Sequence, residues 1–295
     1  MNIVIVFGND HTNNVGVIQS LGKAGFKSIG LLFGLKSDFV VSSKYTDGII
    51  TAKDPQACID KLLENIPSSS KRIPIIACCD IAALTLEHNA DKLKGHFVFE
   101  HSIHYTLDYL AKKENQVRMA ITTGFNVPKS WNLQDSKEIP SDICYPCLIK
   151  PLVSCEGAKS DIRVCRTREE LERNLNTLEH TKNVLLQQYI ERDYEISILG
   201  CGLTTGKCII PAVENKLTLY PKYVGLECLA NMQPLEDGSI KKSIERLIAT
   251  TGYVGLFSVE MMHCKDDDKF YFTEINFRND GAEALVTKYG ANLPL

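Results

Sequence analysis

The sequence has no apolar run as long as the roughly 18 residues that a membrane-spanning helix needs. It also has no basic excess, because its formal net charge is −3, and this argues against nucleic acid as a partner. The first residues, MNIVIVFGND, lack the basic segment and the cleavage site of a signal peptide, so they are predicted to form a first strand. Together with 44% apolar and 23% charged residues, these absences predict a globular, cytoplasmic protein.

The sequence also lacks the cysteine patterns of a disulfide framework or of a structural zinc site. Its eleven cysteines are an odd number in a long chain, and none clusters with histidine at zinc-binding spacing. Cys144 and Cys147 form a CxxC pair, but a redox pair opens a helix, whereas the residues that follow, LIKP, are predicted to form a strand. We therefore interpret the cysteines as free thiols.

A dinucleotide-binding turn is missing as well, although the first hundred residues alternate between strand-like and helix-like patterns. Strands are predicted at 2–8, 27–33, 46–52 and 73–79, and helices at 15–24, 55–65 and 81–93. This alternation predicts an α/β domain with a parallel sheet and helices on both faces. The first strand-to-helix turn reads FGNDHTNNVG, which is not G-x-G-x-x-G, so an NAD(P)-dependent oxidoreductase is the weaker alternative.

The rest of the chain predicts an α+β arrangement. Helices are expected at 110–123, at 168–178 and at 239–251, the last with Ser239 as its N-cap. Strands are expected at 147–153, 161–166, 183–190, 194–203, 255–262 and 269–277.

The last two predicted strands carry the strongest chemical signal. Side chains alternate along a strand, so Glu274, Asn276 and Arg278 share one face, and Glu260 lies within the otherwise apolar strand FSVEMM. If the two strands form a hairpin, Glu260 and Glu274 converge, and two carboxylates with an amide oxygen are ligands that suit Mg²⁺. The residues alone leave an alternative open, in which Arg278 forms an ion pair with one glutamate or the polar row faces solvent.

Two further segments point to a nucleotide. Lys150 ends an apolar strand directly before Pro151, where its ammonium can reach phosphate while its stem stays packed, and a small polar loop with Lys159 follows. The main chain around Gln188, Tyr189 and Ile190 can read an adenine edge, and Glu195 can accept from ribose hydroxyls. The alternative for this second segment is a plain strand connection with surface charges.

In this order, the segments resemble the ATP-grasp superfamily, and in particular carboxylate–amine ligases and carbamoyl-phosphate-synthase-like proteins. The resemblance covers nearly the whole chain and rests on the following segments: LAKKENQVRMAITTGFNVPKS, YPCLIKP, VLLQQYIERDYEI and GLFSVEMMHCKDDDKFYFTEINFRNDG. The last is the most specific, because Glu-x-Asn-x-Arg after an earlier strand glutamate is the family's arrangement for metal and phosphate.

The resemblance implies a role for each matching residue. Lys113, with Lys112 as a near alternative, is the first nucleotide lysine, and Lys150 is the second, at the α- and β-phosphates. Gln187, Gln188, Tyr189 and Ile190 form the adenine-binding segment, and Glu195 accepts from the ribose. The implied metal ligands are Glu260, Glu274 and Asn276, with Mg²⁺ as the ion and Mn²⁺ as an alternative. Arg278 faces the transferred phosphoryl group; the role of Lys159 stays open because the loop has only Gly157.

The resemblance further implies an ATP-dependent ligase that activates a carboxylate as an acylphosphate for attack by an amine. Its partners are small-molecule acid and amine substrates, with neither nucleic acid nor membrane, and a homodimer is left open. A catalytically silent ATP-binding module remains as an alternative. The expected organisation is a Rossmann-like domain at 1–108, a small ATP-grasp subdomain at 109–186 and a large one at 187–295. Since the family's fold continues past the segment KYGANLP, a short member and a truncated chain are both open.

Overall fold

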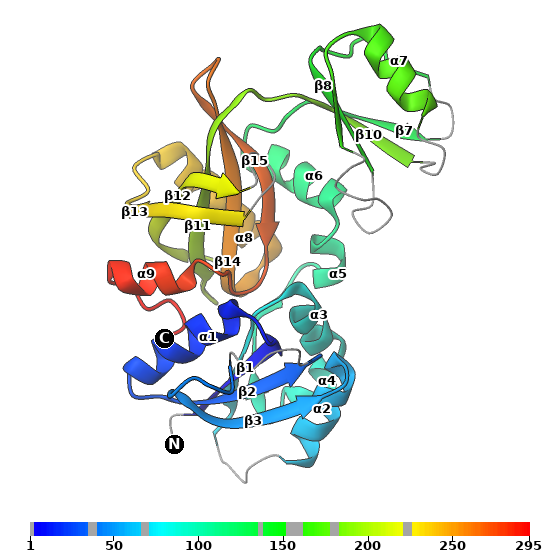
Figure 1. Ribbon diagram of the computed structural model, residues 1–295. Helices are drawn as coiled ribbons and strands as arrows, with labels where there is room; N and C mark the ends of the chain where they lie inside the picture. Colours follow the sequence, from blue (N-terminus) through cyan, green and yellow to red (C-terminus); the bar gives the residue numbers. More distant parts are fainter. Residues whose placement is uncertain are drawn as a thin grey trace. The chain divides into compact units, whose positions relative to one another are not determined.

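The computed structural model describes residues 3–34, 40–65, 71–134, 138–151, 162–177, 183–220 and 226–295 (Figure 1). The chain divides into two compact units. Unit 1 comprises Met1–Phe125, Tyr194–Met261 and Phe272–Leu295, and unit 2 comprises Asn126–Asp193 and Met262–Tyr271. Within the described ranges, no helix is both long enough and apolar enough to cross a membrane.

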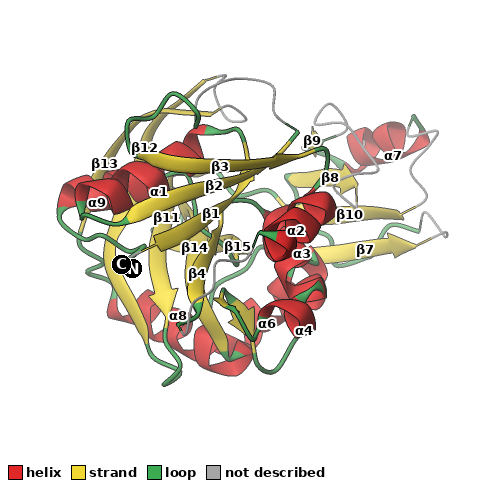
Figure 2. Ribbon diagram, turned by 90° about the horizontal axis from the view of Figure 1, so that it is seen from below, coloured by secondary structure: helices red, strands yellow, loops and turns green. Residues whose placement is uncertain are grey.

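Unit 1 begins with a parallel sheet, as the sequence predicts. Its strands run in the order β3-β2-β1-β4-β5 and pair in parallel throughout. Their bounds are β1 (Ile3–Asn9), β2 (Lys27–Phe33), β3 (Thr46–Ala52), β4 (Ile73–Ala77) and β5 (Phe97–Val98). The helices are α1 (Thr12–Lys23), α2 (Pro55–Glu64), α3 (Asp80–His88) and α4 (Ala90–Leu93). Figure 2 shows α1 on one face of this sheet and α2 and α3 on the other, as right-handed crossovers require.

The helix predicted at 81–93 is wrong in one respect, because it is broken at Asn89. This residue has φ −106° and ψ 13°, and its Nδ2 donates to the Thr85 carbonyl at 2.9 Å and to Gln56 Oε1 at 2.9 Å. An asparagine side chain that bonds to the backbone of the preceding turn competes with continuation of the helix. The helix therefore ends at His88 and a short α4 follows.

The second sheet of unit 1 carries the three residues expected to hold the metal, Glu260, Glu274 and Asn276. Its main strands are neighbours in the order β13-β12-β11-β14-β15, and β6 (His101–Ser102) pairs with β14. The strands are β11 (Arg192–Gly202), β12 (Cys208–Tyr220), β13 (Leu226–Gln233), β14 (Tyr253–Cys264) and β15 (Lys269–Asn276). β14 and β15 are neighbours joined by a short turn, so the predicted hairpin is confirmed.

Four helices complete unit 1. They are α5 (Leu107–Leu110), α6 (Lys113–Thr123), α8 (Gly238–Thr251) and α9 (Glu283–Tyr289). The predicted helix 110–123 is split, because Lys112 has φ −75° and ψ 122° and acts as the N-cap residue of α6. The predicted N-cap Ser239 is also wrong: Asp237 accepts from the backbone N–H groups of Ser239 at 2.7 Å and Ile240 at 3.2 Å.

Unit 2 is an antiparallel sheet covered by one described helix. The strands β7 (Ser130–Gln134), β8 (Cys147–Pro151), β9 (Arg163–Cys165) and β10 (Asn183–Gln188) run in the order β7-β10-β8-β9. The helix α7 (Arg168–Asn176) starts at Thr167, whose side chain accepts from Glu170 N. Leu171 and Leu175 of α7 pack with strand residues that include Ile149 and Leu186, and these contacts form the core of the unit.

Candidate active site

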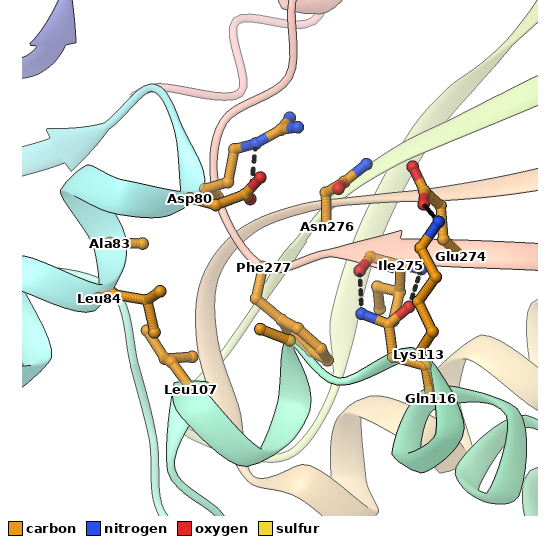
Figure 3. A pocket seen from close by; sticks show the side chains of 12 residues that line it. Asp80, Ala83, Leu84, Leu107, Lys113, Gln116, Glu274, Ile275, Asn276 and Phe277 are labelled. Carbon is orange, nitrogen blue, oxygen red and sulfur yellow. Dashed lines mark hydrogen bonds and ion pairs between the residues drawn. The ribbon is translucent and has the colours of Figure 1, made fainter. Parts of the chain in front are cut away.

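A pocket of about 270 Å³ lies in unit 1, where α3, α5 and α6 meet the end of β15 (Figure 3). It is lined by four charged and two amide side chains together with an apolar wall. The lining residues are Asp80, Ala83, Leu84, Leu107, Ala111, Lys113, Gln116, Glu274, Ile275, Asn276, Phe277 and Arg278. The structure therefore brings Lys113, Glu274, Asn276 and Arg278 together from segments far apart in the sequence.

Lys113 reaches across the pocket to the strand. It is the first residue of α6, and its Nζ lies 3.7 Å from Oε2 of Glu274 (Figure 3). Both side chains keep solvent contact, with 58% and 30% of their surfaces exposed. This geometry allows the ammonium group to contact an incoming anion while Glu274 contacts a cation. Lys112, the alternative from the sequence, occupies the N-cap position before it.

Arg278 is held by two aspartates. Its Nη1 donates to Asp280 Oδ2 at 2.9 Å, and its Nε donates to Asp80 Oδ1 at 3.2 Å. Burial works against the charge of this guanidinium, but attraction to Asp280 and Asp80 outweighs it and raises the pKa of Arg278. The ion pair that the sequence left open thus exists, with aspartates as partners in place of a glutamate.

Asp280 is a buried carboxylate whose negative charge is stabilised from several sides. It accepts from Ser258 Oγ at 2.9 Å and from Ala282 N at 3.1 Å, as well as from Arg278. Burial alone would raise its pKa, but Arg278 and these hydrogen bonds lower the pKa of Asp280 below its ordinary value. Ser258 also accepts from Nδ2 of Asn276 at 3.3 Å, which links this carboxylate to the strand face.

Glu260 extends the carboxylate group along β14. Burial raises the pKa of Glu260, and the charges of Glu274 and Asp280 raise it further, while Lys216 partly offsets both effects. Nζ of Lys216 lies 3.3 Å from Oε2 of Glu260, and only 13% of the lysine side chain is exposed. A buried carboxylate whose pKa is raised by burial and by neighbouring negative charges marks a place where a divalent cation lowers the energy.

The donor set fits a hard divalent cation. Two carboxylates, Glu260 and Glu274, and the amide oxygen of Asn276 are the ligands that Mg²⁺ takes together with phosphate oxygens. Nδ2 of Asn276 donates a hydrogen bond to Oγ of Ser258, and this bond orients the side-chain amide. Glu260, Glu274 and Asn276 are therefore the residues that would hold the ion.

Lys150, expected from the sequence to be the second nucleotide lysine, lies in unit 2. Nζ of Lys150 on β8 donates to Oε1 of Gln187 at 2.6 Å, and Nε2 of Gln187 donates to Ser130 Oγ at 3.0 Å. Lys150 is thereby tied across β8 and β10, which pair with Lys150 opposite Leu185. The network orients the lysine and Gln187 as a unit.

The expected adenine-binding segment comprises the last two residues of β10, Gln187 and Gln188, and the two residues after it, Tyr189 and Ile190. The N–H of Gln188 donates to the Lys129 carbonyl at 2.8 Å, and the N–H of Tyr189 donates to the Pro146 carbonyl at 3.0 Å. An adenine edge would therefore be read by other main-chain groups of this segment. Ile190 is buried, with 6% exposed.

Glu195, expected from the sequence to accept from the ribose, is not among the described residues that line the pocket. Glu195 lies on β11 in unit 1, directly opposite Lys216 in the antiparallel register of β11 and β12. Lys159 and the loop around it lie outside the described residues.

Sequence reasoning missed several residues of this site. Asp280 follows Arg278 closely in the segment NFRND, and that spacing was the available signal. Asp80 stands after the buried strand β4, where parallel strands commonly present functional groups. Lys216 lies on β12, a strand that the sequence pattern did not predict.

One other group of ligand-type side chains occurs among the described residues, formed by Glu87, His88 and Asp108. Both carboxylate oxygens of Glu87 accept from Leu107 N, at 2.8 and 2.7 Å, and Nε2 of His88 lies 2.6 Å from Asp108 Oδ2. These bonds tie the end of α3 to the start of α5, so we interpret the group as structural.

Comparison with known proteins now decides the family. The model of the ATP-grasp domain matches residues 118–287, more than half of the chain. The chain belongs to the ATP-grasp family. The resemblance drawn from its motifs is confirmed.

Curated ATP-grasp relatives match part of the chain. The chain is 27% identical over 167 residues to formate-dependent phosphoribosylglycinamide formyltransferase from Wolinella succinogenes, covering 53% of this chain and 41% of that protein. It is 30% identical over 151 residues to D-alanine–D-alanine ligase from Parasynechococcus marenigrum, covering 48% and 41%. The aligned segments thus span about two fifths of the length of these relatives.

The fold agrees with these matches. A crystal structure of the biotin carboxylase complex with β,γ-ATP from Campylobacter jejuni superposes with a TM-score of 0.73 at 17% identity, covering 99% of this chain and 69% of that one. At this identity the likeness shows the fold, and it confirms the predicted mixed α/β architecture.

Proposed function

We propose that this ATP-grasp chain binds ATP with Mg²⁺ and transfers the γ-phosphoryl group to a substrate carboxylate. The resulting acylphosphate is attacked by an amine, which forms an amide-type bond and releases phosphate. The observation that carries this proposal is the convergence of Lys113, Glu274, Asn276 and Arg278 on one pocket. Cationic donors beside hard oxygen ligands are the groups that phosphoryl transfer requires.

Each residue has a defined part in the proposal. Glu260, Glu274 and Asn276 hold the divalent cation, which neutralises charge on the phosphates when it is bound. Lys113 and Lys150 bind phosphate oxygens, Gln187–Ile190 contacts the adenine and Glu195 accepts from the ribose. Arg278, fixed in orientation by Asp80 and Asp280, stabilises charge on the transferred group and on the carboxylate that receives it.

The reaction needs little covalent chemistry from the protein. A carboxylate oxygen of the acid forms the new bond to phosphorus as the bond to ADP breaks. The amine nitrogen then attacks the acyl carbon, phosphate leaves, and the amine loses a proton. Positioning and electrostatic stabilisation carry both steps. The membership in the ATP-grasp family supports this chemistry over the oxidoreductase alternative.

A catalytically silent ATP-binding module is the second candidate, and one observation favours it. Arg278 already has two carboxylate partners, at 2.9 and 3.2 Å, so its charge is partly neutralised before any substrate arrives. In this case ATP would bind, but no acid would accept the phosphoryl group.

The deciding experiment is a screen for ADP release with Mg·ATP, using carboxylic acids paired with amines. The ligase proposal expects release that depends on both the acid and the amine, with one amide formed for each ADP. ATP binding by calorimetry without any acid-dependent release would support the silent module. Absence of ATP binding would overturn both.

A further inference from the structure

The side chain of Gln116 is bound to the backbone of a single strand residue, Ile275. Nε2 of Gln116 donates to the Ile275 carbonyl at 2.8 Å, and Ile275 N–H donates to Oε1 of Gln116 at 3.2 Å (Figure 3). Nε2 also donates to the Leu110 carbonyl at 2.9 Å. The residue is 7% exposed, so these bonds form away from solvent. The amide thus makes the pair of hydrogen bonds that a neighbouring strand would make.

The position of Ile275 gives this contact its importance. β15 is the last strand in the order of its sheet and pairs with β14 on one side. The backbone groups on its other side therefore have no neighbouring strand in that order. Ile275 stands between Glu274 and Asn276, two of the three proposed metal ligands, and is 2% exposed. Since successive side chains alternate across a strand, Ile275 points to the core while its two neighbours point to the other face.

Fixing both polar groups of Ile275 fixes the peptide planes on either side of it. The N–H belongs to the peptide shared with Glu274, and the carbonyl belongs to the peptide shared with Asn276. The directions of both ligand side chains depend on these planes. Gln116 therefore controls the geometry of two ligands without touching either of them.

The same helix supplies a phosphate-binding candidate. Lys113 begins α6 one turn before Gln116, and its Nζ is 3.7 Å from Glu274. Residues three apart lie on neighbouring positions of one helix face. One contact between α6 and β15 thus sets the distance between the lysine and the ligand strand.

We propose that Gln116 is a positioning residue that holds Glu274 and Asn276 in the arrangement needed to bind a divalent cation at the ATP phosphates. This inference rests on the proposed function, since it concerns the same metal. Residues outside the coordination sphere that orient metal ligands commonly change metal affinity by about 10- to 100-fold when they are removed, and Gln116 would act in this way through the backbone of Ile275.

The test compares Gln116→Met with the parent. Methionine has a similar length and fills the same space, but it cannot hold the Ile275 backbone. We expect the Mg²⁺ concentration that half-saturates ATP binding to rise at least about tenfold. ATP binding measured in EDTA, without divalent cation, should change little. A general loss of stability would not raise the Mg²⁺ requirement while leaving ATP binding in EDTA unchanged.

Asn115 offers a matched control at the preceding position of the same helix. It is 4% exposed, and its Nδ2 donates to the Tyr109 carbonyl at 2.9 Å, away from β15. Asn115→Leu should lower the melting temperature but leave the Mg²⁺ requirement at the parent value. If both variants shift the requirement equally, or neither does, the positioning role is refuted.

A second variant covers the case in which Gln116→Met does not fold. Gln116→Asn keeps the amide but is one methylene shorter, so it cannot reach both groups of Ile275 at once. It should also raise the Mg²⁺ requirement, and an unchanged requirement overturns the inference. A parent protein that binds no ATP, or binds it without any effect of Mg²⁺, would instead disprove the proposed function.

Discussion

Arg278 and Asp280 form an ion pair in which Nη1 donates to Oδ2 at 2.9 Å, with 17% and 18% of the two side chains exposed. Desolvation opposes both charges, yet the pKa of Arg278 is raised and that of Asp280 is lowered, so each charge stabilises the other. The pair presents a guanidinium of fixed orientation to the pocket. The two residues can be tested separately: a substitution of Asp280 tests stability, and a substitution of Arg278 tests phosphoryl transfer.

Asp280→Asn should destabilise the protein by about 2–3 kcal/mol near neutral pH. The change preserves shape but leaves a largely buried arginine without its closer partner, and breaking such pairs is costly. Because the folded-state pKa of Asp280 is lowered, its contribution is present above the unfolded pKa and is lost as pH falls. Urea unfolding should therefore show a difference that shrinks at acidic pH. Asp80→Asn is the control: its side chain is 63% exposed, so the loss should stay below about 1 kcal/mol.

Arg278→Lys should keep ATP binding and lower ADP release at saturating Mg²⁺ by at least about tenfold. Lysine retains the charge but loses the planar fork that bonds to Asp80 and Asp280 and orients the remaining donors. Calorimetry measures ATP binding, and a coupled assay of ADP release measures turnover. Equal turnover in the two proteins would remove Arg278 from the transfer step.

Glu274→Gln and Glu260→Gln should each raise the Mg²⁺ requirement at least about tenfold with little change in overall fold. Both changes keep volume and remove one negative charge. Glu260→Gln should also cost some stability, because Lys216, with 13% of its side chain exposed, loses its partner. ADP release against Mg²⁺ concentration is the measurement, with the exposed Glu236→Gln as a charge control. If both variants titrate like the parent, the metal assignment is wrong and the acids serve the ion-pair network.

Lys150→Ala should weaken ATP binding about tenfold or more while unit 2 stays folded. The lysine is held at 2.6 Å from Gln187 and is proposed to bind phosphate, so its loss removes a charge-assisted contact. Calorimetry measures affinity, and circular dichroism checks folding. Arg173→Ala, an exposed change on α7, controls for loss of positive charge in the same unit. Unchanged affinity in folded Lys150→Ala would exclude the lysine from the nucleotide site.

Glu100 should make the stability depend on pH around neutrality. It is 6% exposed, and burial raises its pKa to about 7 from the ordinary 4.5, although Ala77 N–H donates to its carboxylate. Burial raises the pKa values of Cys78, Cys201 and Tyr253, and the charge of Glu100 raises them further.

Since the folded-state pKa of Glu100 is raised, its contribution is full below the unfolded value of 4.5 and is lost as pH rises through about 7. The free energy of unfolding should fall by about 3 kcal/mol over this range. Glu100→Gln keeps the acceptor for Ala77 and should flatten the dependence. If the free energy of unfolding depends on pH in the same way in the parent and in the variant, Glu100 does not change its protonation state over this range, and the prediction is wrong.

Much of the fold was predictable because its signals are local. Buried strands such as β1 and β4 are short apolar runs, and β14 and β15 alternate clearly enough to place Glu260 and Glu274 on adjacent strands. The pattern failed at β12, where Pro211, Glu214 and Lys216 interrupt the apolar residues. That strand is stabilised by its pairing with β11 and β13, which a local window does not contain.

For this protein, the sequence by itself determined the strand face that carries Glu274 and Asn276, because alternation along a strand is a local property, whereas Arg278 lies two residues beyond the end of β15. The sequence also identified Lys113 and Lys150 as phosphate-binding candidates. Only the tertiary structure decided that Arg278 pairs with Asp80, nearly two hundred residues earlier, and that Gln116 holds the backbone of Ile275. Such partners depend on how helices pack against the end of a strand. Packing of this kind is set by the three-dimensional fold of unit 1, and no periodic pattern in the sequence encodes it.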